Sequence, residues 1–426
     1  MTGTEPGREH GGEAAFADRV RIHLRRNYLA HLAHGLLGQT GMRLVNAPTF
    51  LPAYVFALSG SELIVGVARG LQYFGMFLSP IVGATIIEHR RRVLPVGFLI
   101  GSLMRVQILG LALAGIFLAP PGPLIATCVL LGLFGVLLGI QGVVFNFLVA
   151  KVIPVDKRGL LMGLRNALSG VTAAVVAVYA GRALVETNAF GNGYAATFGL
   201  AFVLTSFGLA MLLFVREPES PYVLEPSRVS DRLRDLPRLL RSDPDFTRYF
   251  LARALAVMGR MAVPFYWIYA QARIELSGSR LGEVTAAFVL AQSIGNLAWG
   301  VVADRVGFRA VFAASLGLWG LSAVLLLGTD DYLRLLLVFA GLGAGLGGFQ
   351  MSAQNLVLEF GLRHDLPLRI AVANSASELV AALSAVAGGM LALWVSHTAV
   401  FAVAIASQAI ALVIVLFGVR DPRSRS

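Results

Sequence analysis

The sequence has little charge and only one cysteine. Charged residues make up 14% of its 426 residues, and Cys128 lies in an apolar stretch. A single cysteine excludes an intramolecular disulfide and a cysteine metal cluster. A phosphate-binding Gly-x-x-x-x-Gly-Lys-Ser/Thr loop is also absent, and the short loops offer no nucleophile, base or metal cluster. We therefore expect neither an ATP site nor an enzyme, and no cofactor or metal.

Apolar residues dominate what is present. They make up 57% of the chain, and the mean hydropathy is +0.74. This is outside the usual range for a soluble domain, so apolar surface must face lipid. A helix that crosses about 30 Å of hydrocarbon needs about 20 residues. We predict an all-α membrane protein whose twelve transmembrane helices lie at about 28–58, 62–87, 93–119, 122–150, 159–183, 194–215, 249–273, 281–303, 309–329, 332–358, 368–394 and 397–419.

The net charge of +11 comes from basic residues that gather on one side of the predicted helices. The clusters at 19–26, 90–92 and 216–248 all fall on the side of the N-terminus, whereas the opposite loops hold few arginines. This asymmetry follows the positive-inside rule and explains the charge without a nucleic-acid partner. It predicts a multi-pass inner (plasma) membrane protein with both termini in the cytoplasm. We expect no removable signal peptide in the first 27 residues, because they are charged and Gly-rich. We also expect a monomer whose partners are the bilayer and a small-molecule solute.

The two halves of the chain repeat each other. Leu58-Ser-Gly-Ser recurs 218 residues later as Leu276-Ser-Gly-Ser, and Val215-Arg-Glu-Pro-Glu-Ser recurs as Val419-Arg-Asp-Pro-Arg-Ser. Two six-helix repeats are a transporter architecture with the solute site near the midplane between them. Within the linker, the segment 230–241 has spacing that fits either a helix on the membrane surface or a solvated segment. The predicted organisation is a cytoplasmic tail, a six-helix bundle, a cytoplasmic linker, a second six-helix bundle and a tail, at 1–27, 28–215, 216–248, 249–419 and 420–426.

One loop carries a specific motif. Gly300-Val-Val-Ala-Asp-Arg-Val-Gly-Phe-Arg resembles the signature loop of the major facilitator superfamily of secondary transporters. The resemblance implies two pseudo-symmetric six-helix bundles and a role for the loop in bracing neighbouring helix ends in one conformation. The corresponding loop of the first half departs from the pattern, because Glu88 stands one residue late. The residues that match the motif are Gly300, Asp304, Arg305, Gly307 and Arg309.

Two arginines lie inside predicted membrane helices at near-symmetric positions. Arg43 is on the first helix and Arg260 on the seventh, and intramembrane charges normally face a cavity or a partner. Helical spacing places Gln39 and Asn46 on the face of Arg43, and Trp267 on that of Arg260. Two planar cations suit a carboxylate, phosphate or sulfate. The organophosphate-phosphate antiporters of the superfamily are similar in the placement of their arginines. The alternative is that both arginines are structural and pair with Glu378 or with carbonyl groups.

Other polar residues in apolar runs extend the candidate site. Glu378, with Asn374 one turn earlier, is a candidate to carry a coupling proton, unless an arginine holds it ionised. Gln350 and Gln354 can hydrogen-bond a solute or a neighbouring helix. We expect Arg105 to be structural, and the role of Arg69 stays open. His31 and His34 fit packing better than a proton relay.

These observations predict a secondary transporter that works by alternating access on a small organic anion or an anionic amphiphile. The alternative within the same fold is a proton-coupled exporter of drugs or lipids. Weak anchoring by aromatic side chains would favour that alternative, and the candidates are Phe50, Tyr54, Tyr73, Phe145, Phe265 and Trp267.

Overall fold

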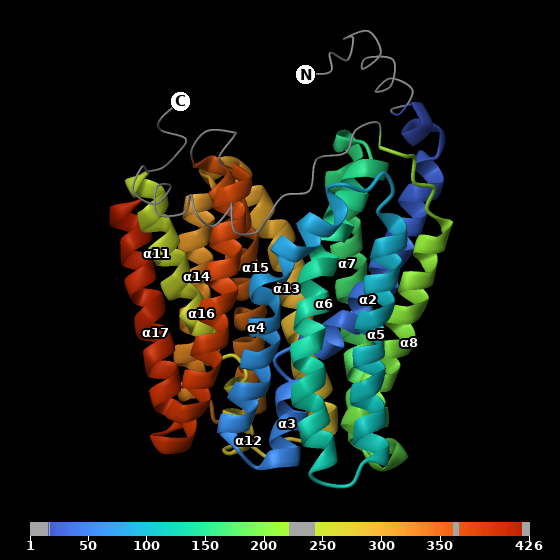
Figure 1. Ribbon diagram of the computed structural model, residues 1–426. Coiled ribbons are helices and arrows are strands. Elements are labelled where there is room, and N and C mark those ends of the chain that lie inside the picture. The colour runs from blue at the N-terminus through green and yellow to red at the C-terminus, as the bar shows by residue number, and fades with distance from the viewer. Residues whose placement is uncertain (1–15, 17, 221–242, 361–365, 420–426) are drawn as a thin grey trace.

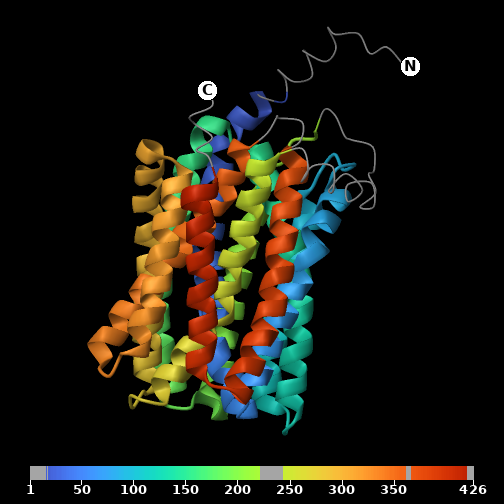
Figure 2. The ribbon, with the colours of Figure 1, turned by 90° about the vertical axis from the view of Figure 1, so that its left-hand side faces the viewer.

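The protein consists of two bundles of membrane-length helices that stand side by side (Figure 1). The computed structural model describes residues 16, 18–220, 243–360 and 366–419, and these residues form helices and no strand. Figure 2, turned by 90°, shows that the helices of both bundles run in the same general direction. The all-α, twelve-crossing fold predicted from the apolar runs is confirmed.

The first bundle contains six crossings, of which the first is made of two helices and the fifth ends in a π-helical turn. Its elements are α2 (Leu24–Asn46) with α3 (Phe50–Ser59), α4 (Glu62–Ile87), α5 (Leu94–Phe117), α6 (Gly122–Val152), α7 (Val155–Tyr179) with the turn Ala180–Val185, and α8 (Gly193–Met211).

The second bundle repeats this pattern, and its first crossing is again made of two helices. Its elements are α11 (Pro244–Met258) with α12 (Phe265–Gln271), α13 (Gly278–Val306), α14 (Phe308–Leu327), α15 (Tyr332–Leu356), α16 (Leu366–Trp394) and α17 (His397–Val413), followed by a π-helical turn, Ile414–Gly418.

The first and seventh crossings were predicted as continuous helices, and this prediction was wrong. Ala47 is extended, with φ −56° and ψ 150°, as expected for a residue that precedes a proline, here Pro48. In the second bundle a 3₁₀ turn, Gly259–Met261, follows α11, and α12 begins only after Pro264. Proline lacks the N–H that a continuous helix needs. Ten helices of the described residues are long and apolar enough to cross a membrane alone, and the broken crossings account for the other two.

The ends of the bundles differ slightly from the predicted domain boundaries. α2 begins at Leu24, inside the predicted tail, and α11 begins at Pro244, inside the predicted linker. Asp243 caps α11, because its side chain accepts a hydrogen bond of 3.1 Å from the N–H of Phe246. The predicted amphipathic segment 230–241 and the C-terminal tail lie outside the described residues. We call the end of the molecule where α8 ends and α11 begins the linker side.

The two bundles touch closely on the side opposite the linker. α4 packs on α16 there so tightly that a Cβ on Gly66 would lie 2.4 Å from the carbonyl oxygen of Ala385. An ion pair also joins the bundles, with 2.6 Å between Arg182 Nη2 and Glu283 Oε1. The molecule is therefore closed on this side.

Candidate solute-binding site

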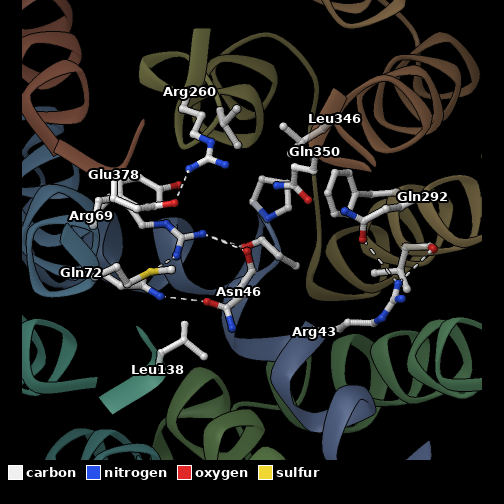
Figure 3. A pocket seen from close by; sticks show the side chains of 17 residues that line it. Arg43, Asn46, Arg69, Gln72, Leu138, Arg260, Gln292, Leu346, Gln350 and Glu378 are labelled. Carbon is white, nitrogen blue, oxygen red and sulfur yellow. Dashed lines mark hydrogen bonds and ion pairs between the residues drawn. The ribbon is translucent and has the colours of Figure 1, made fainter. Parts of the chain in front are cut away.

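A polar cavity lies between the bundles at the level of the two broken crossings (Figure 3). It has a volume of about 250 Å³ and is lined from both bundles. A second hollow of about 260 Å³ lies on its linker side and shares five lining residues with it, so the two are parts of one cavity. The shared residues are Met76, Leu138, Arg260, Gln350 and Glu378.

The cavity opens toward the linker side. Gly142, Asn146 and Gln354 line its second part and are exposed. A Cβ on Gly142 would meet nothing within 4 Å. Because the opposite side is closed, a solute can reach the cavity in this conformation only from the linker side.

Arg260 lies in the broken seventh crossing and pairs with Glu378 of α16. The distance from Arg260 Nη1 to Glu378 Oε1 is 3.4 Å, and the two side chains are 14% and 17% exposed. The guanidinium also lies 5.6 Å from the centre of the Tyr73 ring. The other carboxylate oxygen of Glu378, Oε2, is buried and has no hydrogen-bond partner among the described residues. This pair is one of the two alternatives that the sequence left open.

Arg43 of α2 has only neutral partners in the described part of the chain. It donates a hydrogen bond of 2.9 Å to Ser293 Oγ and one of 3.4 Å to Gln292 Oε1, both on α13 of the other bundle. Its second terminal nitrogen donates to Asn166 of α7. Figure 3 shows Arg43 directed toward Gln292 and away from Arg260. Arg43 therefore bridges the bundles, and no carboxylate of the described residues compensates its charge.

Arg69 of α4, whose role the sequence left open, is a third cation at the cavity. Its Nη2 donates to the carbonyl oxygens of Asn46, at 3.0 Å, and Ala47, at 3.4 Å. Its Nη1 donates to Gln72 Oε1 at 2.7 Å. A cation at the C-terminal end of a helix satisfies its last carbonyls and matches its dipole. Pro48 was the available signal, because a break at proline leaves such carbonyls free.

A fourth cation, Arg253 of α11, lines the linker-side part of the cavity. Its side chain donates to the Ala353 carbonyl oxygen at 3.2 Å and to Asn374 Oδ1 at 2.8 Å. Arg253 therefore fixes Asn374, the neighbour of Glu378 one turn away. The described lining holds four arginines and one glutamate, a formal excess of 4 − 1 = +3.

Most of the residues that the sequence proposed for the site do line the cavity, but two do not. Gln39 faces α7, where its side-chain oxygen accepts a hydrogen bond of 2.8 Å from Ser169 Oγ. Trp267 is 2% exposed and lies in the hydrophobic core. The prediction for Trp267 assumed that the seventh crossing is one continuous helix. The break before α12 changes the direction of its side chain relative to Arg260. The proposed residues that do line the cavity are Arg43, Asn46, Arg260, Gln350, Gln354, Asn374 and Glu378.

The signature loop lies at the linker-side ends of α13 and α14. Gly307 has a φ of +88°, a conformation that favours glycine, and it separates the two helices. Arg309 donates to the carbonyl oxygens of Val415, at 3.1 Å, and Leu416, at 2.6 Å, and so ties α14 to the last crossing. The side chains of Asp304 and Arg305 are exposed and make no hydrogen bond or ion pair to any residue that the structure describes.

The first bundle uses a different acid at its corresponding end. Glu217 accepts hydrogen bonds of 2.8 Å from the N–H groups of Val93 and Leu94, and its Oε1 lies 2.8 Å from Lys151 Nζ. It therefore caps the start of α5. Glu88, the motif candidate, ends α4 as its C-cap. Sequence reasoning missed Glu217, although the repeat Val215-Arg-Glu-Pro-Glu-Ser contained it.

Arg105 and the two histidines occupy packed positions away from the cavity lining. Arg105 donates to the carbonyl oxygens of Thr205, at 2.7 Å, and Gly101, at 2.6 Å. His31 and His34 are buried, and both rings lie against Phe145. These contacts support the structural interpretations made from the sequence.

Two helical bundles around a midplane cavity, with broken helices at that cavity, define the class of secondary transporters. Residues 249–426 match the family model described as Major Facilitator Superfamily. A search of curated proteins gives no match. The family match covers the second bundle, and the whole chain has the fold of this superfamily of transporters. Its long apolar helices make it a multi-pass membrane protein.

Solved structures of similar fold cover nearly the whole chain. A mutant of the nucleoside transporter NupG has 10% sequence identity and a TM-score of 0.68 over 93% of this chain and 99% of its own. A D-xylose-proton symporter has 13% identity and a TM-score of 0.72 over 94% and 99%. The xylose transporter XylE from E. coli, partially occluded and inward open, has 14% identity and a TM-score of 0.66 over 94% and 100%.

Proposed function

We propose that this transporter moves a small organic anion through the central cavity by alternating access. The excess of three arginines over carboxylates in the described lining carries the proposal. Uncompensated cations in a membrane interior are costly, and they persist where they serve a solute or ion pathway. An anion that accepts charge-assisted hydrogen bonds would complete the coordination of these side chains.

The cavity also suits the uncharged part of such a solute. Its two parts, of about 250 and 260 Å³, together lie within the volumes usual for small-molecule pockets. The amides of Gln72, Gln292 and Gln350 line its midplane part and can donate to or accept from hydroxyl groups. The xylose and nucleoside transporters of similar fold carry polar solutes, which agrees with this lining.

The two membrane arginines take different parts in this proposal. Arg43 is the primary anion ligand, because its present partners, Asn166, Gln292 and Ser293, are neutral and are exchanged for a carboxylate or phosphate at little cost. Arg260 binds the anion only when Glu378 releases it.

We assign the coupling role to Glu378. The solute anion and the Glu378 carboxylate compete for Arg260, and a proton that binds the carboxylate ends that competition. The unpartnered Oε2 is the atom available to receive the proton. The charged and titratable groups around it are Arg260, Arg253, Arg69 and Tyr73. Anion and proton would then travel together.

The signature loop acts on the other conformation. With the linker side open, Asp304 has no partner among the described residues, and closure of this side would bring it to a neighbouring helix end. The Arg182–Glu283 pair holds the opposite side closed now and would break as the bundles rock. By the arginine asymmetry, the linker side is cytoplasmic.

The exporter of drugs or lipids is the weaker candidate. Of the six aromatic residues that would anchor such a solute, only Tyr73 lines the described cavity. Phe50, Tyr54, Phe265 and Trp267 are at most 2% exposed and belong to the core.

Thermal stabilisation of the purified protein tests the proposal, because a solute that binds only the folded state raises its melting temperature. The panel pairs each carboxylate or phosphate compound with a neutral analogue of similar size. We expect the anions to stabilise and their neutral analogues to have little effect. Equal stabilisation by a neutral analogue would overturn the anion proposal and favour a neutral polar solute.

A further inference from the structure

A surface hollow, separate from both parts of the solute cavity, lies on the linker side where α2 and α7 begin. It has a volume of about 510 Å³. Its described lining contains three cations and no carboxylate. The lining residues are Arg21, Leu24, Arg25, Tyr28, Leu29 and Lys157.

The lining residues from α2 and the turn before it form one stripe along the helix. They recur at intervals of three and four, which places them on a single helical face. The helix turns continuously across His23, because its N–H bonds to the Arg19 carbonyl at 3.3 Å and its own carbonyl accepts from Asn27 at 2.9 Å. Along the stripe, both arginines lie in the first part, with Leu24 beside Arg25, and Tyr28 and Leu29 follow toward the membrane interior. The stripe therefore passes from charge to hydrocarbon.

The cations of this hollow are poorly neutralised by the protein. Lys157 has one acidic neighbour, Asp156, at 3.4 Å, and the two side chains are 53% and 67% exposed, so water screens the pair. No ion pair involves Arg21 or Arg25 within the described ranges. The described lining together with Asp156 therefore carries a formal charge of 3 − 1 = +2.

Exposed apolar side chains lie in the lining of the hollow and close to its lining residues in the sequence, and they indicate what covers it. Ile22 is 76% exposed, Val155 75% and Leu160 62%, and Leu29 in the lining itself is 54% exposed. A free anion such as phosphate would satisfy the cations and leave these side chains in water. An amphiphile would satisfy both, because its acyl chains cover apolar surface while its headgroup meets the basic residues.

We propose that this hollow binds an anionic phospholipid. Arg21, Arg25 and Lys157 hold the headgroup phosphate, and an acyl chain lies along Leu24 and Leu29. The lipid joins the linker-side ends of α2 and α7. The same two helices carry Arg43 and its partner Asn166 deeper in the membrane, so the lipid steadies the wall of the solute cavity. The proposal stands whether or not the solute is an anion.

Lipid binding to the full-length protein tests the site directly. The protein is placed in phosphatidylcholine nanodiscs with or without phosphatidylglycerol, and retained lipid is counted by native mass spectrometry. The test variant is Arg21→Gln/Arg25→Gln/Lys157→Gln. The control variant, Arg90→Gln/Arg91→Gln/Arg92→Gln, removes the same charge from exposed arginines elsewhere on the linker side.

We expect the wild type and the control variant to retain phosphatidylglycerol, and the test variant to lose about 100-fold in affinity, at roughly a fivefold loss for each of the three basic contacts. Equal losses in the two variants would overturn the site in favour of a diffuse surface potential. Displacement of the lipid by inorganic phosphate at similar concentration would overturn the lipid in favour of a free anion. The melting temperature of each variant in pure phosphatidylcholine shows that the fold is retained.

Discussion

Arg43 and Arg260 hold corresponding places in the two bundles but have different partners. Each is bonded to a residue on the fifth crossing of its own bundle, Asn166 on α7 and Glu378 on α16. The first bundle thus has a neutral amide where the second has a carboxylate. The same repeated scaffold presents one cation ready for an anion and one cation already neutralised, so the two halves have separate tasks in the proposed cycle.

The breaks in the two lead helices differ in the same way. In the first bundle the break follows Asn46, and a residue of another helix, Arg69, binds the free carbonyls. In the second bundle the 3₁₀ turn of the break contains Arg260 itself. The break holds a cation in place in one half and presents a cation in the other.

The largest expected effect is on the stability of the protein when the Arg260–Glu378 pair is broken. Replacement Arg260→Gln leaves Glu378 without its counter-charge in a mostly buried site, and we expect a loss of about 3 kcal/mol, the lower end for breaking a buried pair. The measurement is the melting temperature of the purified variant. The double variant Arg260→Gln/Glu378→Gln should recover most of the loss. A double variant as unstable as the single one would show that the pairing is not the cause.

The next effect is on solute affinity at the uncompensated cation. Replacement Arg43→Gln removes a charge-assisted contact of about 1.5 to 3 kcal/mol and should weaken anion binding by about 10- to 100-fold, with a melting temperature close to that of the wild type. Arg43→Lys should retain only part of the anion affinity, because a point charge does not reproduce the planar hydrogen-bonding fork of arginine. Normal affinity in a well-folded Arg43→Gln protein would end the assignment.

Asn166→Asp sharpens the comparison by giving the first bundle the acid that the second has. The new carboxylate would neutralise Arg43 and compete with the solute, so we expect anion affinity to fall by about tenfold. The matched control, Asn166→Ser, keeps a polar side chain without the charge. A loss in the serine variant equal to that in the aspartate variant would point to shape rather than charge.

Arg69→Gln tests the helix break of the first bundle. It removes the cation from the carbonyls of Asn46 and Ala47, and we expect a loss of about 1 kcal/mol in stability. Hydrogen exchange of residues 44–52 should be faster in this variant than in the wild type. Arg69→Lys keeps the charge, so these residues should exchange more slowly in it than in the glutamine variant. Unchanged exchange in the glutamine variant would contradict the capping role.

The smallest effect concerns the closed side. Arg182 is 61% exposed and Glu283 30%, so their pair contributes about 0.2 to 1 kcal/mol. Arg182→Ala should shift the population modestly toward opening on that side, and spin-label distances between the bundles measure the shift.

Asp304→Asn should have the opposite effect. It removes a contact expected only in the state closed on the linker side, so the population should shift toward the state open on the linker side. Coincident distance distributions for both variants and the wild type would contradict this account.

The sequence by itself determined the number of crossings, the two repeats, the family motif and seven of the polar residues that line the cavity. Membrane crossing depends on the length and composition of a local apolar run, and intramembrane charges such as Arg43 and Glu378 are visible in those runs. Tertiary structure decided the remainder. Arg260 pairs with Glu378 across 118 residues of sequence, and Trp267 turned into the core because the seventh crossing breaks before α12. Periodicity places residues on the face of one unbroken helix, whereas a partner is chosen by the packing of helices that are distant in the chain.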